Sequence, residues 1–263
     1  MRDRWQPTGE EVLLRVGAVS AVIGTVLQVA AGTSQSVQLG ATTDVALATL
    51  AEQPDWMWPV VYMGFIIGAL LWMAALVALA TTLTAGVAWA LARLAVVTAI
   101  VGVTLHAVDG ALNAVVLEGL ARAWAAAPVG ERTALVQDGD LLRRVLDGTW
   151  ASVITLYHGL PFVLAGSAVA LSRRYPAWLG WVGVIGGSGS LVVGIAMLLG
   201  VQTGLAVPFA VVLSLFMVVL GWLLWTQATS GVAEPAVSWS AARRSTVCSG
   251  VTARSRTERN HGI

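Results

Sequence analysis

The sequence predicts an all-α membrane protein, a polytopic bundle of six transmembrane helices with both termini in the cytoplasm. Hydrophobic residues make up 57% of the chain and charged residues only 11%. The mean hydropathy is +0.79, and the few charges cluster between long apolar runs. Soluble globular domains carry roughly 25% charged residues. Most of this chain is therefore expected to face lipid or other apolar helices.

A hydrocarbon core about 30 Å thick is crossed by roughly 20 apolar residues of helix. Runs of this length, bounded by charged residues, Pro or Gly, occur six times. The predicted spans are residues 11–31, 58–83, 90–117, 149–171, 177–199 and 205–225. They form a predicted transmembrane domain over residues 11–227, preceded by an N-terminal segment of residues 1–10. An even number of spans places both ends of the domain on one side of the membrane.

Arginine sets the predicted orientation, because short loops that carry Arg and Lys stay in the cytoplasm. All 15 basic positions are Arg, a usage typical of a GC-rich bacterial genome. One side holds Arg2, Arg4, Arg15, Arg93, Arg173, Arg174 and the arginines of the tail. The other side holds Arg122, Arg132, Arg143 and Arg144. We therefore expect cytoplasmic termini in a bacterial plasma membrane.

Tryptophan agrees with this arrangement, because indole rings collect at the two membrane–water interfaces. The outer ends of the predicted spans hold Trp56, Trp58, Trp124 and Trp150. The inner ends hold Trp89, Trp178, Trp181, Trp222 and Trp225. All of these rings are expected at the level of the lipid headgroups.

The first span has an alternative interpretation as a cleaved signal peptide. Basic residues precede its apolar run, and the sequence Val29-Ala30-Ala31 resembles a cleavage site. However, Glu10 and Glu11 are out of place in a basic leader, and the stretch before the apolar run is long. The sequence therefore favours a retained first helix.

Three segments lie outside the predicted spans. In the outer loop of residues 32–57, Thr43 and Asp44 precede apolar residues and predict a short capped helix on the bilayer surface. In the outer loop of residues 118–148, leucines alternate with charges and predict a helical hairpin over the outer mouth, with a solvated connector as the alternative. The tail, residues 228–263, lacks apolar periodicity and is predicted to be disordered and cytoplasmic.

Composition and motifs exclude several classes of function. A net charge of +1 without a basic patch argues against nucleic-acid binding. A single cysteine, Cys248, excludes an internal disulfide, and no nucleotide-binding loop, nucleophile elbow or HExxH pair is present. Small residues in the fifth span indicate close helix packing in lipid. These residues are Gly183, Gly187, Ser190 and Gly194.

Polar residues within the third span are the strongest functional signal. At 100° per residue, His106 and Asn113 lie about 20° apart on the helix and Asp109 about 60° away. Their shared face also carries small residues on which another helix can pack, namely Ala99, Gly102 and Gly110. We therefore expect the face to point into the bundle. An aspartate at this depth is expected to be either protonated or hydrogen-bonded, and a histidine is the expected partner.

The fourth span adds a second polar stripe with Thr155 and His158. Pro161 removes the backbone hydrogen bond that the Tyr157 carbonyl would accept, which loosens the helix beside His158. Counted from the outer span ends, Asp109 and His158 lie at similar depths. We therefore predict one internal polar pocket containing His106, Asp109, Asn113, Thr155 and His158.

Several chemistries remain open for this pocket. It would bind a small molecule or ion, or relay a proton. The structural alternative is a self-satisfied His–Asp–Asn network that sets helix register. A metal bound by His106, Asp109 and His158, or haem held between the two histidines, is chemically acceptable without diagnostic spacing. The sequence names no cofactor and no catalytic residue.

The sequence also resembles a family of actinobacterial six-helix membrane proteins of unknown function. The resemblance rests on an opening span with Arg15-Val16-Gly17, an outer loop ending in Trp56 and Trp58, and a late run from Tyr175 to Gly183. It implies architecture and no chemistry.

Three classes of function follow from the sequence. The favoured one is a binding, sensing or transport-associated protein whose partners are the lipid bilayer and a small molecule or ion. The alternatives are an accessory membrane subunit without a ligand site, and a membrane-embedded metal-dependent enzyme or haem protein.

Overall fold

A computed structural model describes residues 8–36, 42–201 and 204–230. Throughout these residues the regular structure is helical, and six stretches are long and apolar enough to cross a membrane. The predicted all-α bundle of six spans is therefore confirmed. Most of the predicted N-terminal segment, nearly all of the tail and Cys248 lie outside the described residues.

Four of the six stretches are single helices. They are α1 (Gly9–Ser36), α3 (Met57–Thr82), α8 (Ala177–Leu198) and α9 (Ala206–Thr229). The other two are composite, because a π-helical turn joins two α-helices without a break. They are α4 (Gly86–Ala111) with η1 (Leu112–Leu117) and α5 (Glu118–Ala126), and α6 (Arg132–Val153) with η2 (Ile154–Gly159) and α7 (Leu160–Leu171).

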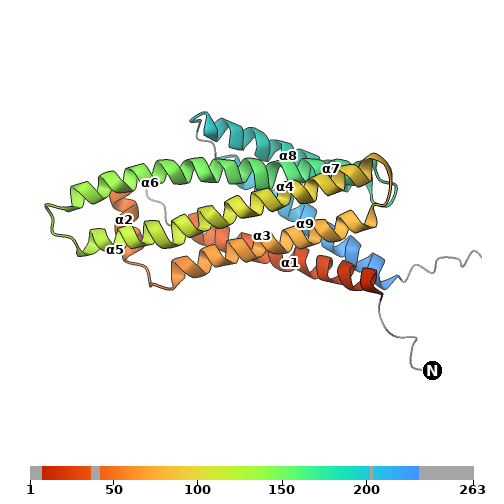
Figure 1. Cartoon of the computed structure of the whole chain (residues 1–263), viewed down its shortest axis with the longest axis horizontal. Coiled ribbons are helices and arrows are strands. Elements are labelled where there is room, and N and C mark those ends of the chain that lie inside the picture. Colours follow the sequence, from red (N-terminus) through yellow and green to blue (C-terminus); the bar gives the residue numbers. More distant parts are fainter. Residues whose placement is uncertain (1–7, 37–41, 202–203, 231–263) are drawn as a thin grey trace, which may run out of the picture. The chain divides into compact units, whose positions relative to one another are not determined.

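The composite stretches are longer than a bilayer requires. They contain 41 and 40 residues, which at 1.5 Å per residue is about 60 Å, roughly twice the hydrocarbon thickness. Helix therefore continues past residue 117 and begins well before residue 149, where the predicted spans ended. The second predicted outer loop is a helical hairpin of α5 and α6, which extends the bundle at one end (Figure 1).

The short helix expected in the first outer loop is α2 (Thr43–Ala51). It packs on α5 and α6 through Ala46, Leu47 and Leu50, which are all buried. The Thr43 hydroxyl donates to Asp140 of α6 and lies 3.4 Å from an Arg143 guanidinium nitrogen that donates to it. The α5–α6 hairpin therefore forms the contact surface of α2.

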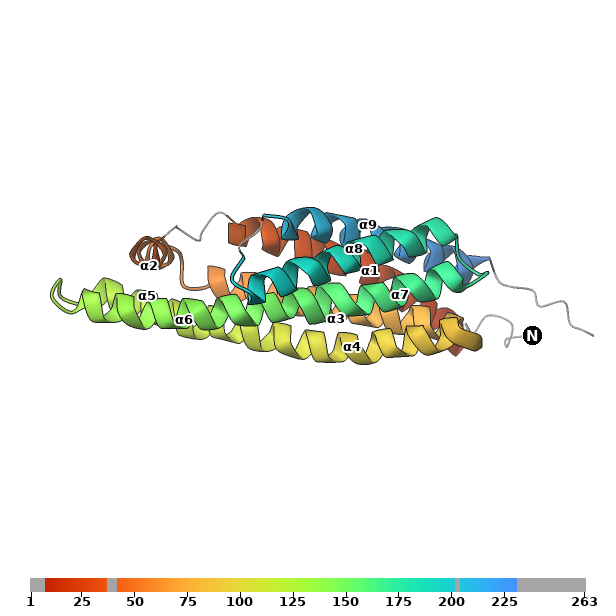
Figure 2. The same ribbon diagram turned by 90° about the horizontal axis from the view of Figure 1, so that it is seen from above.

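The spanning helices form a closed ring. Along the ring α1 contacts α3, α3 contacts α4, α4 contacts α7, α7 contacts α8, α8 contacts α9 and α9 returns to α1. Figures 1 and 2 show α1 beginning and α9 ending at the same end of the bundle, opposite the α5–α6 hairpin. Large side chains fill the interior of the ring, with Trp72, Tyr157, Phe162 and Phe216 fully buried.

Glycines bring neighbouring helices close together. A Cβ atom on Gly166 of α7 would lie 2.6 Å from the Val184 amide nitrogen and 2.7 Å from the Gly180 carbonyl oxygen, both on α8. Gly183 and Gly187 of the predicted small-residue stripe are packed against α7 in the same way. The stripe is therefore a helix-packing surface, as its composition predicts.

Polar contacts link neighbouring elements at both ends of the ring. At the end where α1 begins, Arg174 donates to Gln227 at 3.0 Å and to the Thr82 carbonyl at 3.1 Å. The Tyr175 hydroxyl lies 2.8 Å from that of Thr82, and burial raises the pKa of Tyr175.

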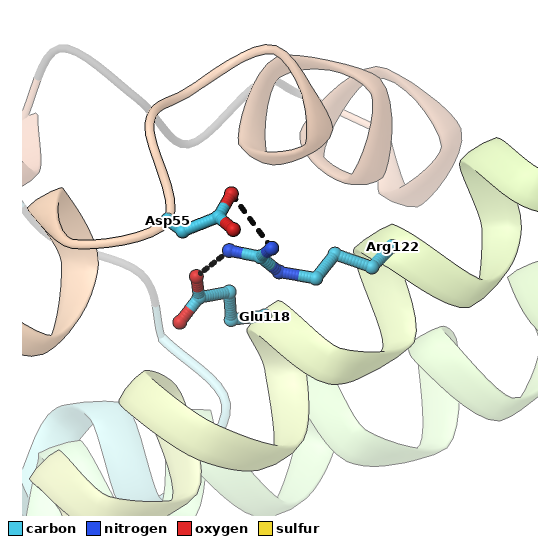
Figure 3. A network of polar contacts seen from close by, with 3 residues as sticks. All are labelled: Asp55, Glu118 and Arg122. Atoms are coloured by element: carbon cyan, nitrogen blue, oxygen red, sulfur yellow. Dashed lines mark hydrogen bonds and ion pairs between the residues drawn. The ribbon is translucent and has the colours of Figure 1, made fainter.

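At the opposite end, Arg122 of α5 binds Glu118 and places Nη1 2.7 Å from Asp55 Oδ1 (Figure 3). The hydrogen bond and the positive charge of Arg122 hold the pKa of the Asp55 carboxyl below its usual value. This contact joins the segment before α3 to the α5–α6 hairpin.

The tryptophans depart in part from the predicted interfacial pattern. Trp56 is 66% exposed, but Trp58 two residues later is only 2% exposed. Trp124 and Trp150 are partly buried and pack against buried hydrophobic residues of the bundle interior. The reason is that α5, α6 and α2 surround this end of the bundle, so an indole near a predicted span end meets protein.

Replacing Gly166 by Ala should lower the free energy of unfolding by about 1–3 kcal/mol, because the new methyl group overlaps the α8 backbone. Gly119→Ala is the matched control, since apart from the adjoining backbone of its own helix no atom lies within 4 Å of a Cβ at that position of α5. The control should be neutral or stabilising by about 0.5–1 kcal/mol. Thermal unfolding of purified protein measures both, and equal effects at the two sites would contradict the packing argument.

The arginine distribution predicts that the α7–α8 connection faces the cytoplasm and the α5–α6 hairpin faces outward. In a Cys248→Ser background, a membrane-impermeant maleimide should label Asp138→Cys from outside intact cells. Arg173→Cys should react only after the membrane is opened. Labelling of residue 173 in intact cells would reverse the orientation.

Candidate functional site

The three polar residues of the third predicted span lie inside the ring. His106 and Asp109 on α4 are 3% and 2% exposed, and Asn113 on η1 is 7% exposed. Ala99, Gly102 and Gly110 of the same face are also buried. The inward orientation expected from helical periodicity is therefore confirmed.

Two π-helical turns flank these residues. Asn113 belongs to η1, and His158 belongs to η2, which ends two residues before Pro161. The loosening expected from the proline takes the form of this π-turn, in which the usual backbone register is interrupted. A Cβ on Gly102 would lie 2.6 Å from the Leu156 carbonyl oxygen, so glycine allows α4 to approach η2 closely.

Among the described residues Asp109 is paired with Thr149 and Asn113 and not with a histidine, contrary to the expectation from the sequence. The Thr149 hydroxyl of α6 lies 2.6 Å from Asp109 Oδ1 and donates to it. Asn113 donates its amide to Asp109 Oδ2 at 3.3 Å and to the Asp109 carbonyl at 2.9 Å. The reason is that Asn113 stands one turn away on the same helix, while Thr149 projects from the adjacent α6.

The two histidines belong to a group of aromatic rings inside the bundle. Their ring centroids are 6.5 Å apart. The His106 ring lies 5.4 Å from that of Tyr157 and 5.6 Å from that of Phe65, while His158 lies 6.2 Å from Trp72. Both nitrogens of His106 and Nδ1 of His158 are buried without a hydrogen-bond partner among the described residues.

A cavity of about 550 Å³ lies beside these groups. All six spanning stretches contribute to its lining, through α1, α3, α4 with η1, α6 with η2, α8 and α9. Its polar lining includes Asp109, Asn113 and His158. His106 stands behind this lining, in ring contact with His158 and with Trp150, which also lines the cavity.

Thr155 lies outside the cavity. Its hydroxyl donates to the Ala151 carbonyl at 2.8 Å, and the residue packs against Gly194 of α8. The predicted stripe of Thr155 and His158 assumed a regular α-helix. The π-turn changes the angle between successive side chains along η2. Thr155 and His158 therefore contact different neighbours.

Several residues of the site were missed by the sequence analysis. Gln28 of α1 lines the cavity and donates to the Phe65 carbonyl at 3.2 Å and to the Tyr157 hydroxyl at 3.3 Å. Gln28 was recognisable as a polar residue in an apolar run. Trp72 also lines the cavity, and its position in the middle of a span, away from either interface, was the available signal. Thr149 was treated only as a span end.

The structure also shows whether the residues considered as metal ligands are grouped together. Among the described residues, no three His, Cys, Asp or Glu side chains are grouped so that they could hold a metal ion. His106, Asp109 and His158 therefore do not form such a group. The arrangement instead offers hydrogen-bonding groups and aromatic rings around an internal space.

Comparison of the chain with protein-family models, with curated proteins and with solved structures found no match. The six-helix membrane architecture and the site therefore rest on the residues and their geometry alone.

Proposed function

We propose that this chain is a multi-pass protein of a bacterial plasma membrane that binds a small molecule inside its helix bundle, as a sensor or in transport. The observation that carries the proposal is the cavity of about 550 Å³ lined by all six spanning stretches. Small-molecule sites are commonly about 300–1,000 Å³, mostly apolar, with a few convergent polar groups. Asp109, Asn113, His158 and Gln28 are such groups.

The hydrogen-bonding pattern favours a ligand site over a purely structural network. A network that only sets helix register should satisfy its own polar atoms, since an unpaired buried donor or acceptor costs about 1–3 kcal/mol. Asp109, Asn113 and Thr149 satisfy one another, but Nδ1 of His158, a residue of the cavity lining, has no partner among the described residues. This imbalance is expected where a site is completed by a bound molecule.

Filling the cavity should abolish binding without unfolding the protein. Ala210 of α9 lines the cavity, so Ala210→Trp should displace any bound molecule. Native mass spectrometry of the purified chain should detect an adduct with the wild type that is absent from this variant. Leu215→Trp is the control, because Leu215 is exposed on the same helix and does not belong to the cavity lining.

The control should retain the adduct, and both variants should unfold at temperatures close to the wild type. A cavity that serves only packing would give a different result. The wild type would then carry no adduct, and Ala210→Trp would either stabilise the fold by filling space or leave it unchanged.

Asp109→Asn separates the structural role of the carboxylate from its role in binding. The amide keeps an oxygen for Thr149 but presents N–H groups to Asn113, so one hydrogen bond is lost. We expect the free energy of unfolding to fall by about 1 kcal/mol and by no more than about 2. Chemical unfolding measures this change, and a much larger loss with an unaltered adduct would favour the structural role.

A further inference from the structure

We propose that the ligand of this cavity is an amphiphilic organic cation, with a protonated amine at Asp109 and an apolar portion along α9. This inference rests on the proposed function and specifies its ligand. Four features of the lining carry it: the sign of its charge, its remaining hydrogen-bonding capacity, its aromatic rings and the position of its apolar surface.

The charged side chains that line the cavity are all acidic. Asp109 and Asp147 belong to the lining, and none of the described lining residues is Arg. Both side-chain hydrogen-bond partners of Asp109, Thr149 and Asn113, are neutral. Buried charges are normally paired, so a cationic ligand would supply the counter-charge that the protein does not.

The two amide side chains of the lining, Gln28 and Asn113, retain acceptors rather than donors. Gln28 directs its amide nitrogen to the Phe65 carbonyl and the Tyr157 hydroxyl. Asn113 directs its amide nitrogen to two acceptors of Asp109. Both side chains are thus left with an oxygen to offer, alongside the carboxylates. A ligand with N–H donors matches this capacity.

Aromatic rings also line the polar part of the cavity. Phe65, Trp72 and Trp150 all line it, and the last two lie within 6.4 Å of the His158 ring. Cations are attracted to aromatic faces, most strongly to that of Trp. An ammonium group therefore finds both a carboxylate and aromatic neighbours in this region.

The part of the lining contributed by α9 is mostly apolar and reaches the outer surface of the ring. Ala206, Val207, Ala210 and Val211 of α9 form one wall. Val207 and Val211 are 69% and 62% exposed, and Val29 of α1, also in the lining, is 50% exposed. Surface of this kind on a spanning helix meets lipid chains. The cavity therefore connects acidic groups to the bilayer, which suits an amphiphile.

Three probes with the same eight-carbon tail test the head group: octylammonium, 1-octanol and octanoate. Isothermal titration at neutral pH, where the amine is protonated and the acid ionised, would use the full chain in lipid nanodiscs, with empty nanodiscs subtracted. Octylammonium should bind the wild type at least about tenfold more tightly than either other probe, since truncating a buried charge pair costs at least that much.

Asp109→Asn should reduce octylammonium affinity by about tenfold or more and leave octanol binding unchanged. Asp138→Asn is the matched control, because Asp138 is exposed on α6 and is not in the cavity lining. It should bind all three probes as the wild type does. The head-group comparison on the wild type stands even if a variant folds poorly.

Two outcomes would overturn the inference in distinguishable ways. Preference for octanol or octanoate, abolished by Ala210→Trp, would reject a cationic ligand and leave the proposed binding function in place. Absence of binding of all three probes, together with absence of a native adduct, would reject both.

Discussion

Lipid offers no hydrogen-bond partner, and this constraint organises the molecule. Each polar side chain within a spanning helix must find a partner inside the ring or bond to its own backbone. Thr25, Ser190 and Thr155 bond to carbonyls one turn earlier in their helices. Asp109 and Gln28 instead reach other helices. Those inter-helix contacts surround the cavity, so the same constraint that satisfies polar groups also concentrates them there.

Close packing elsewhere makes the cavity distinctive. Glycines allow α1 to approach α3, α4 to approach η2 and α7 to approach α8 without intervening side chains. The end of the ring towards Arg174 and Tyr175 is filled by large buried side chains such as Phe162, Phe216 and Leu220. Protein interiors normally leave few voids larger than a water molecule. A space of about 550 Å³ lined by all six spanning stretches is therefore the candidate binding site of this bundle.

The acidic carboxylate, the amide oxygens and the aromatic rings of the lining all suit the proposed cationic ligand. Each group alone has a structural explanation, because Asp109 and Gln28 both hold neighbouring elements together. Their combination leaves the amide oxygens of Gln28 and Asn113 available, and no Arg in the described lining, beside a mostly apolar wall. The unpartnered histidine nitrogens add further capacity. A polar network that is only partly satisfied is costly, which favours a role that requires that capacity.

The sequence by itself determined the membrane class, the number of spans and the inward direction of His106, Asp109 and Asn113. These follow from run length and from the 3.6-residue period of one helix, which are local properties. Pro161 likewise predicted a loosened helix beside His158. Small residues in the fifth span predicted close helix packing, because the stripe lies on one face of a single helix.

Only the tertiary structure decided which partners these residues meet. The pairing of Asp109 with Thr149, the contacts of Gln28 and Trp72, and the separation of Thr155 from the cavity all depend on how different helices are rotated and aligned. The position of the predicted hairpin against α2, and the Arg122 ion pair with Asp55, are likewise set by tertiary contacts. Such contacts join residues far apart in the chain, and no local periodicity encodes them.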